Sequence, residues 1–545
     1  MIRGDQMLMR TKDRFGEPLR GRRPALRTHR RNDAGYTLLE LLVVMGILAV
    51  LIAVATPQLM GYFGKAKTQS VQLQIENIGT ALELYYMENG SYPSASVGLK
   101  ALVEATPEAP RWNGPYLKEG IPMTRTGITR RLAALALATV CLLPIARVRA
   151  DVVTDWNVIA LNATAVPPNS IPQSRALAIV HGAIYDAVRA VDRKGGAYAI
   201  DVEAPAGTSV DAAVVSAAHG SLVRLAPAER QMLDAALNVS LSKIADGQGK
   251  TEGTALGKQI AEKLVALRST DGAAVKVVFT AKPGVGLYQF TPPHSLPAIL
   301  AQWGSVTPFV LRSSAGLDLK GAPALTAAQF ARDFEEVRSV GARNSTTRTA
   351  DQTAAAIFWT VQTAVPWHAA ARAASAAKGL SLSENARLFA LLSMASADSQ
   401  IIAFAEKYNR PHWRPITAIR AATDLNIAAL KGDIGWEPLL VTPPHPEYPS
   451  AHAMFSGAAE AVLRGFFGDD QVDVSVTAPG SFGVTRTYHK FSELTEEVDN
   501  ARVWGGIHFR SADVDGSEIG RKIGEIILRE FANSPRKTTQ LGERP

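Results

Sequence analysis

The stretch His445-Pro446-Glu447-Tyr448-Pro449-Ser450-Ala451-His452 places a serine and a histidine immediately before an apolar run at helical spacing. Residues 453–463 continue that run, so Ser450 and His452 are predicted to lie at a helix N-terminus. The N–H groups and the dipole at a helix N-terminus favour a bound anion. This stretch therefore predicts an oxyanion site carried by an α-helical domain.

Two further clusters flank this stretch. Lys407 and Arg414 precede it in the pattern Lys-x6-Arg-Pro, and Arg502 and His508 follow it in the pattern Arg-x5-His. Two guanidinium groups and an ammonium group suit the oxygens of a tetrahedral oxyanion. Residues six apart lie about 240° apart on an unbroken helix. We therefore expect a break at residues 505–506, which are both Gly, to bring Arg502 and His508 to one site.

The order and internal spacing of these clusters resemble the vanadium-dependent haloperoxidase and type 2 phosphatidic acid phosphatase superfamily. The resemblance covers nearly all of residues 151–535 and implies a mainly α, helical-bundle fold. Upstream segments that agree with bacterial haloperoxidase-like members are Arg175, His181-Gly-Ala-Ile-Tyr185-Asp186, Thr291-Pro-Pro, Trp303-Gly304, Thr307-Pro308-Phe309 and Arg348-Thr-Ala-Asp-Gln352.

The resemblance also implies roles for individual residues. His508 binds vanadium as vanadate or attacks phosphorus, His452 is the acid–base group, and Lys407 polarises a bound peroxide. Ala451 stands where the motif usually has Gly, and its backbone N–H is expected to contact the anion. The residues implied to hold orthovanadate or phosphate are Lys407, Arg414, Ser450, Ala451, Arg502 and His508.

Two chemistries remain open at this site. A haloperoxidase would use vanadate, hydrogen peroxide and a halide, whereas an acid phosphatase would use a phosphate ester, a phosphohistidine intermediate and no cofactor. The same residues serve both, but the lack of several apolar spans in residues 151–545 favours the haloperoxidase. A zinc hydrolase built from His445, Glu447, His452 and His508 is disfavoured, because neighbouring Lys and Arg would repel a divalent cation.

The N-terminal region carries a separate signal. About 18 residues from Leu38 are apolar with Glu40 as the single charge, which predicts a membrane helix over about 38–56. Gly35-Tyr36, Glu40 and the segment Trp112–Leu117 resemble type IV pilins and the major pseudopilin of type II secretion. The resemblance implies that a prepilin peptidase removes leader 1–35, that Tyr36 is methylated, and that the helix assembles with type II secretion components.

This resemblance ends near residue 122, so residues 36–122 are interpreted as a truncated pseudopilin segment with a long N-terminal helix. Residues 123–150 contain arginines, an apolar stretch and small residues before Ala150, as in a secretory signal peptide cleaved after Ala150. Two joined genes would explain this order. The alternative is a pseudopilin that carries the enzyme as a passenger. Residues 151–535 would form the enzyme domain and 536–545 a tail.

Composition excludes several classes of protein. The chain of 545 residues has 47% hydrophobic and 20% charged residues, which is typical of a globular protein, and its one Cys excludes a disulfide framework. Residues 1–35, with ten basic and four acidic residues, and 123–150, with five Arg and no acid, together carry more than the net charge of +8, so the rest of the chain is mildly acidic. We therefore expect no nucleic-acid partner, and a location anchored in the inner membrane, in the periplasm or outside the cell.

Other polar residues are given simpler roles. Ser381 and Glu384 are expected to form a capping box that begins a helix. His181 is expected in the core, whereas His368 is expected in a surface or loop position together with His219, His294 and His489. Asp513 is a candidate to orient His508 or an arginine.

Overall fold

In this computed structural model the described residues are 97–106, 112, 151–165, 171–293, 295–312, 314, 316–360, 363–424, 430–477 and 484–532. The chain divides into two compact units, Met1–Val140 and Cys141–Pro545. In the described part of the first unit, a 3-10 helix at Gly98–Leu102 buries Leu102, and Trp112 donates its indole N–H to the Ala101 carbonyl at 2.7 Å. The predicted leader, membrane helix, signal-peptide segment and C-terminal tail lie outside the described residues.

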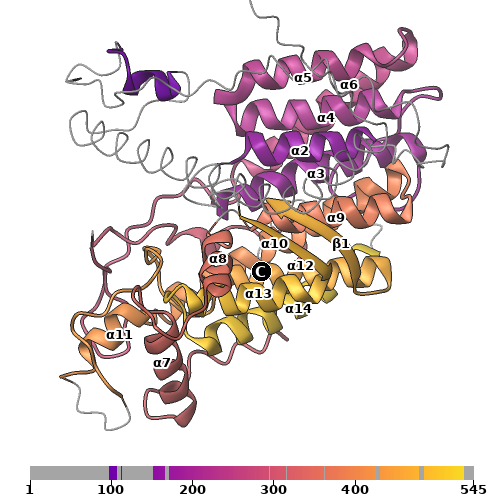
Figure 1. The fold of residues 1–545 in the computed structure, drawn as a ribbon. Coiled ribbons are helices and arrows are strands. Elements are labelled where there is room, and N and C mark those ends of the chain that lie inside the picture. Colours follow the sequence, from indigo (N-terminus) through magenta and orange to yellow (C-terminus); the bar gives the residue numbers. More distant parts are fainter. Residues whose placement is uncertain are drawn as a thin grey trace, which may run out of the picture. The chain divides into compact units, whose positions relative to one another are not determined.

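The second unit is helical, which confirms the predicted mainly α fold (Figure 1). Strands β1 (Gln471–Thr477) and β2 (Thr485–Lys490) pair antiparallel as the only sheet among the described residues. The described helices are α2 (Val152–Ala163), α3 (Ile171–Asp192), α4 (Val210–Leu225), α5 (Arg230–Ser242), α6 (Gln248–Arg268), α7 (Ala328–Val340), α8 (Ala350–Phe358), α9 (Ala364–Lys378), α10 (Leu382–Asn409), α11 (Pro415–Ala421), α12 (Ala451–Phe467), α13 (Phe491–Trp504) and α14 (Arg510–Ala532), with 3-10 helices at Pro227–Glu229 and Trp303–Ser305.

Helix α10 joins two groups of helices. Helix α4 packs between α6 and α3, α3 packs on α10, and α10 packs on α12, which in turn packs on α14 (Figure 1). Ser381 and Glu384 form the predicted capping box at the start of α10. Among the described helices, α10 alone is long and apolar enough to span a membrane, and 94% of that apolar window is buried inside the protein. Its apolar surface is therefore used by the core.

Glycines let α12 and α14 approach at backbone distance. A Cβ atom on Gly520 of α14 would lie 2.2 Å from the Met454 carbonyl oxygen, and one on Gly457 of α12 would lie 2.1 Å from that of Ser517. Both distances are too short for any side chain. This close packing sets the position of Ser450, whose backbone N–H donates to the Ala512 carbonyl at 3.0 Å.

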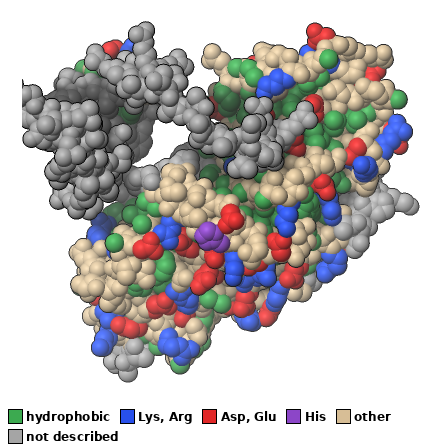
Figure 2. Space-filling view, turned by 45° about the vertical axis from the view of Figure 1, so that its right-hand side comes forward, with side chains coloured by type: hydrophobic (Ala, Val, Ile, Leu, Met, Phe, Trp, Pro, Cys, Tyr) green, Lys and Arg blue, Asp and Glu red, His purple; other side chains and the backbone are tan. Residues whose placement is uncertain are grey.

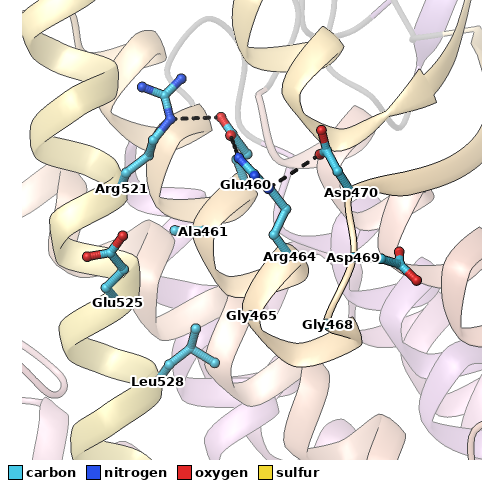
Figure 3. Close-up of a pocket in the computed structure, with 10 residues that line it drawn as sticks. All are labelled: Glu460, Ala461, Arg464, Gly465, Gly468, Asp469, Asp470, Arg521, Glu525 and Leu528. Atoms are coloured by element: carbon cyan, nitrogen blue, oxygen red, sulfur yellow. Dashed lines mark hydrogen bonds and ion pairs between the residues drawn. The ribbon is translucent and has the colours of Figure 1, made fainter.

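Buried charge also links these two helices. Glu460 of α12 is 1% exposed and accepts hydrogen bonds from Arg464 at 2.8 Å and from Arg521 of α14 at 3.1 Å (Figure 3). These residues line a surface pocket of about 400 Å³ together with Asp470 and Glu525. Its lining includes no residue of the three sequence clusters. We therefore interpret it as part of the helix interface and not as the anion site.

We expect Gly520→Ala to lower the free energy of unfolding by about 1–3 kcal/mol, because α14 must shift to accommodate the added methyl group. Urea unfolding of the full chain measures this loss. Glu518→Ala, on the exposed side of the same helix, is the matched control and should change stability by less than about 0.5 kcal/mol. Equal stabilities for the two variants would contradict the close packing.

A second polar cluster lies in the core near α2, α3 and α9. The Asn157 side-chain amide nitrogen lies 2.9 Å from His181 Nε2 and 2.7 Å from His368 Nδ1, and Arg372 donates to its amide oxygen. Both imidazoles are fully buried. The prediction for His181 is confirmed, whereas the prediction of a surface or loop position for His368 is wrong. Packing on Phe389 and the bond to Asn157 place His368 inside.

This cluster predicts acid sensitivity. Burial, together with the charge of Arg372, lowers the pKa of His181 to about 3. The folded pKa is below the unfolded one, so the stabilisation is complete above about pH 6.5 and is lost as the pH falls toward 3. Between these two pH values the free energy of unfolding changes by about 1.4 kcal/mol per pH unit for one such histidine. The free energy of unfolding, measured with urea, should fall between pH 7 and pH 5 by about 2 kcal/mol less in His181→Gln than in wild type. An equal fall in both proteins would contradict the lowered pKa of His181.

Candidate functional site

The three sequence clusters converge in the second unit. In chain order, the first cluster is residues 407–415, the second is 445–452 and the third is 502–513. Lys407 lies in the last turn of α10, Arg414 caps α11, Ser450 caps α12, and the third cluster spans the end of α13 and the start of α14. The residues predicted to contact the oxyanion through their side chains are each 3% exposed or less: Lys407, Arg414, Ser450, Arg502 and His508.

Backbone carbonyl groups surround the first two cations. Lys407 Nζ donates to the carbonyl groups of Pro446 at 2.9 Å and Glu447 at 2.8 Å. Arg414 Nε donates to the His445 carbonyl at 2.9 Å, and its Nη1 donates to the Ile507 carbonyl at 2.7 Å. These cations therefore hold the second and third clusters against the first.

His508 lies in the predicted helix break. Gly505 ends α13, and Gly506 has a φ of +76°, a conformation that a side chain would strain. The break places His508 Nε2 3.1 Å from Arg414 Nη1, and His508 Nδ1 lies 2.9 Å from Glu447 Oε1. The imidazole is thus fixed from both sides.

Ser450, Ala451 and His452 lie at the predicted helix N-terminus. The Ser450 hydroxyl accepts a hydrogen bond from the Ala453 N–H at 3.4 Å. Ala451 is the first residue of α12, and its φ angle is not positive. Alanine therefore needs none of glycine's conformational freedom at this position. Its carbonyl accepts a hydrogen bond from Gln400 at 2.9 Å. His452 is partly exposed as a residue, but its Nε2 atom is buried and has no hydrogen-bond partner in the structure.

Arg502 and Asp513 complete the polar surroundings. Arg502 Nη1 donates to the Trp359 carbonyl at 2.6 Å, whereas its buried Nε atom has no partner. Asp513 is fully buried, and neither carboxylate oxygen makes a hydrogen bond of good geometry. Burial, followed by the charge of Asp499, raises the pKa of Asp513 well above its usual value.

The ionised groups leave an excess of positive charge. Burial lowers the pKa of Arg414 and of Arg502 to about 10, so both guanidinium groups stay charged at neutral pH. Burial and the Arg414 charge lower the pKa of Lys407 well below its usual value, an effect that a neighbouring anion would oppose. Glu447 is the one strongly acidic carboxylate in contact with these groups, because hydrogen bonds from His412 and His508 outweigh its burial and lower its pKa.

The histidines are neutral. Burial, followed by the charge of a neighbouring arginine, lowers the pKa of His445, His452 and His508 well below the usual value. Charges of both signs are interspersed on the molecular face in Figure 2, whereas Lys407, Arg414 and Arg502 are buried. No group of three or more His, Cys, Asp or Glu among the described residues is arranged to hold a metal ion. The zinc alternative therefore has no support in this part of the chain.

Sequence reasoning left three contacts unassigned. Glu447 was considered only as a zinc ligand, yet it bonds His508, while His445 Nδ1 lies 3.0 Å from Arg414 Nη2. Tyr288 is 1% exposed and its hydroxyl has no partner. Burial raises its pKa to about 12, against the opposing effect of the nearby Arg414. The position of Glu447 three residues before Ser450 was the available signal for its role; Tyr288 lies far from the motifs in sequence and gave none.

Family comparisons match three parts of the chain. Residues 387–536 match the VCPO second helical-bundle domain, residues 58–125 match type II secretion system protein G, and residues 30–56 match the prokaryotic N-terminal methylation motif. These matches confirm both predicted resemblances.

Similar proteins divide in the same way. The type II secretion system core protein G of Pseudomonas aeruginosa is 39% identical over 94 residues, which cover 16% of this chain and 66% of that protein. Its counterpart in Escherichia coli K12 is 42% identical over 86 residues, which cover 16% of this chain and 59% of that protein. The chain thus spans less than two thirds of the length of these relatives.

Solved structures resemble the second unit. A bacterial vanadium-dependent iodoperoxidase has a TM-score of 0.61 and 24% identity, covering 69% of this chain and 96% of its own. An apo bacterial vanadium-dependent chloroperoxidase has a TM-score of 0.54 and 15% identity. The match covers 68% of this chain and 95% of that one. The chain therefore has the helical fold of these enzymes.

The charge excess predicts that oxyanions stabilise the protein. Orthovanadate or inorganic phosphate at 100 times its Kd should stabilise the folded full chain by about 2.7 kcal/mol, measured as a rise in Tm. Arg502→Gln should lose most of this rise. Arg343→Gln, which changes an arginine whose side chain is 61% exposed, should keep it. An equal rise in all three proteins would place the anion elsewhere.

Proposed function

We propose that residues 151–535 form an exported vanadium-dependent haloperoxidase, which uses hydrogen peroxide to oxidise halide. The observation that carries this proposal is the buried, positively charged shell around His508, which suits an oxyanion and which lies in a domain with the haloperoxidase fold.

The residues present fit vanadate. Arg502 Nε is a buried donor without a partner, and His452 Nε2 is a buried polar atom without one. A buried polar group that lacks a partner costs about 1–3 kcal/mol, so a ligand that bonds it is favoured. Lys407, Arg414, Arg502, Ser450 and the Ala451 N–H would hold the oxygens, and His508 Nε2 would bind the vanadium. When bound, vanadate supplies a Lewis-acidic centre that activates hydrogen peroxide.

Two other residues would act on the substrate. His452 is neutral because burial lowers its pKa, so its imidazole can accept a proton from hydrogen peroxide as a general base. Lys407 would donate a hydrogen bond to the peroxide oxygen and so draw electron density from the O–O bond. The carbonyl groups of Pro446 and Glu447 hold its ammonium group in place.

An acid phosphatase is the second candidate. His508 accepts a hydrogen bond at Nε2 and is held at Nδ1, the arrangement that a nucleophilic imidazole requires. In that chemistry His508 would attack the phosphorus of a phosphate ester, His452 would protonate the leaving oxygen, and no cofactor would be needed.

The N-terminal segment supports an envelope location. From the matches of residues 30–56 and 58–125, we infer that the chain is anchored in the inner membrane or reaches the periplasm or the exterior. Prepilin peptidase would cleave after Gly35 and leave Tyr36 to be methylated, and Glu40 would contact type II secretion components. Cleavage after Ala150 would instead release the enzyme domain. The expected small-molecule partners are hydrogen peroxide and a halide.

A bromination assay separates the two enzyme candidates. With added orthovanadate in phosphate-free buffer near pH 6, the purified full chain should show peroxide-dependent bromination. His508→Ala should lower the rate at least about 100-fold, because His508 supplies the bond to vanadium. Lys378→Ala, which changes an exposed lysine, should keep the rate.

The opposite result is equally informative. Absence of iodide and bromide oxidation, together with hydrolysis of p-nitrophenyl phosphate that vanadate inhibits and that His508→Ala abolishes, would replace the haloperoxidase with the phosphatase. Absence of both activities and of vanadate binding would contradict both.

A further inference from the structure

Glu447 belongs to the second cluster and contacts both of the others. Its Oε1 atom lies 2.9 Å from His508 Nδ1 and accepts the Phe509 N–H at 3.0 Å, and its Oε2 atom lies 3.4 Å from His412 Nδ1. Its carbonyl accepts from Lys407 at 2.8 Å. Glu447 is 1% exposed, so these contacts replace those that water would make.

Two contacts define the protonation of His508. A carboxylate only accepts hydrogen bonds, so His508 Nδ1 must carry the proton that is directed at Glu447. A guanidinium only donates, so His508 Nε2, 3.1 Å from Arg414 Nη1, must carry the lone pair. Both neighbours independently specify the same neutral tautomer.

Glu447 itself is held firmly. Its N–H donates to the His412 carbonyl at 3.0 Å, which holds its backbone at a second point besides the carbonyl that Lys407 contacts. The 2.9 Å contact to His508 is also shorter than the 3.4 Å contact to His412. Because short charge-assisted hydrogen bonds are the stronger ones, His508 is the main partner of this carboxylate.

Asp513 does not compete for this role. It was a sequence candidate to orient His508, but neither of its oxygens hydrogen-bonds to that imidazole. Glu447 Oε1, by contrast, lies 2.9 Å from His508 Nδ1. The orienting carboxylate thus comes from the second cluster, three residues before Ser450.

We propose that Glu447 is a positioning residue that holds His508 in the Nδ1–H tautomer and thereby presents the Nε2 lone pair to the oxyanion. The role of that lone pair rests on the proposed function, whereas the tautomer follows from the contacts alone. An oxyanion that bonds Nε2 must displace the hydrogen bond from Arg414, whose Nη1 can then donate to the oxyanion oxygens. The Glu447 contact is made to the other ring nitrogen, Nδ1, so it does not have to break.

The test combines a spectroscopic and a binding measurement on the full chain. In protein with [15N]histidine, the His508 signals, identified by their loss in His508→Gln, should report a proton on Nδ1. Glu447→Gln keeps the size of the side chain but lets an amide N–H face Nδ1, so the Nε2–H form should become populated. Calorimetry should show orthovanadate and inorganic phosphate binding about 10- to 100-fold more weakly.

Two further variants interpret the result. Glu447→Asp keeps the charge and should recover part of the affinity and the wild-type tautomer; it also replaces Glu447→Gln if the latter does not fold. Glu437→Gln removes an exposed carboxylate ten residues away that pairs with Arg343 and should match wild type in both readouts.

The outcomes separate this inference from the proposed function. A wild-type His508 protonated on Nε2, or a Glu447→Gln variant with unchanged tautomer and affinity within about twofold, would overturn the positioning role. If the tautomer changes in Glu447→Gln but the wild type binds neither anion, the positioning role stands and the oxyanion function fails.

Discussion

Burial of positive charge is the constraint on which this domain depends. Arg414 is fully buried and forms hydrogen bonds to the carbonyl groups of His445 and Ile507, which lie 31 and 93 residues further along the chain. Lys407 makes the equivalent contacts to Pro446 and Glu447. Burying such groups is costly unless every donor is paired. The carbonyl groups accept two hydrogen bonds from each of these side chains without cancelling the charge, which leaves the site able to attract an anion.

Close packing of helices keeps this arrangement in register. The contact of Gly520 with Met454 and of Gly457 with Ser517 brings α12 and α14 to backbone distance, and the Ser450–Ala512 hydrogen bond joins their N-terminal ends. The helix N-terminus that carries Ser450 and His452 is therefore fixed relative to the loop that carries His508. A site assembled from three separated segments needs such rigidity, since displacements of about 1 Å weaken catalysis strongly.

Local sequence signals were reliable where local chemistry sets the structure. The Ser381–Glu384 capping box, the helix break at Gly505-Gly506 and the N-cap at Ser450 all occur as predicted, because each depends on residues within one or two turns. His368 was assigned wrongly for the converse reason: Asn157, more than two hundred residues away, provides its hydrogen bond. The hairpin β1–β2 was also missed, since its strands are short and alternate polar and apolar residues within a helical domain.

The sequence by itself determined the fold class, the two resemblances and the residue types of an oxyanion site, because spacing within motifs and helical periodicity are local properties of the chain. The tertiary structure alone decided how those residues are used. It showed that Glu447 contacts His508, that burial raises the pKa of Asp513, and that Arg502 and His452 retain polar atoms without partners. Hydrogen-bond partners and pKa values depend on burial and on distances between distant segments, and no pattern along a single segment specifies those quantities.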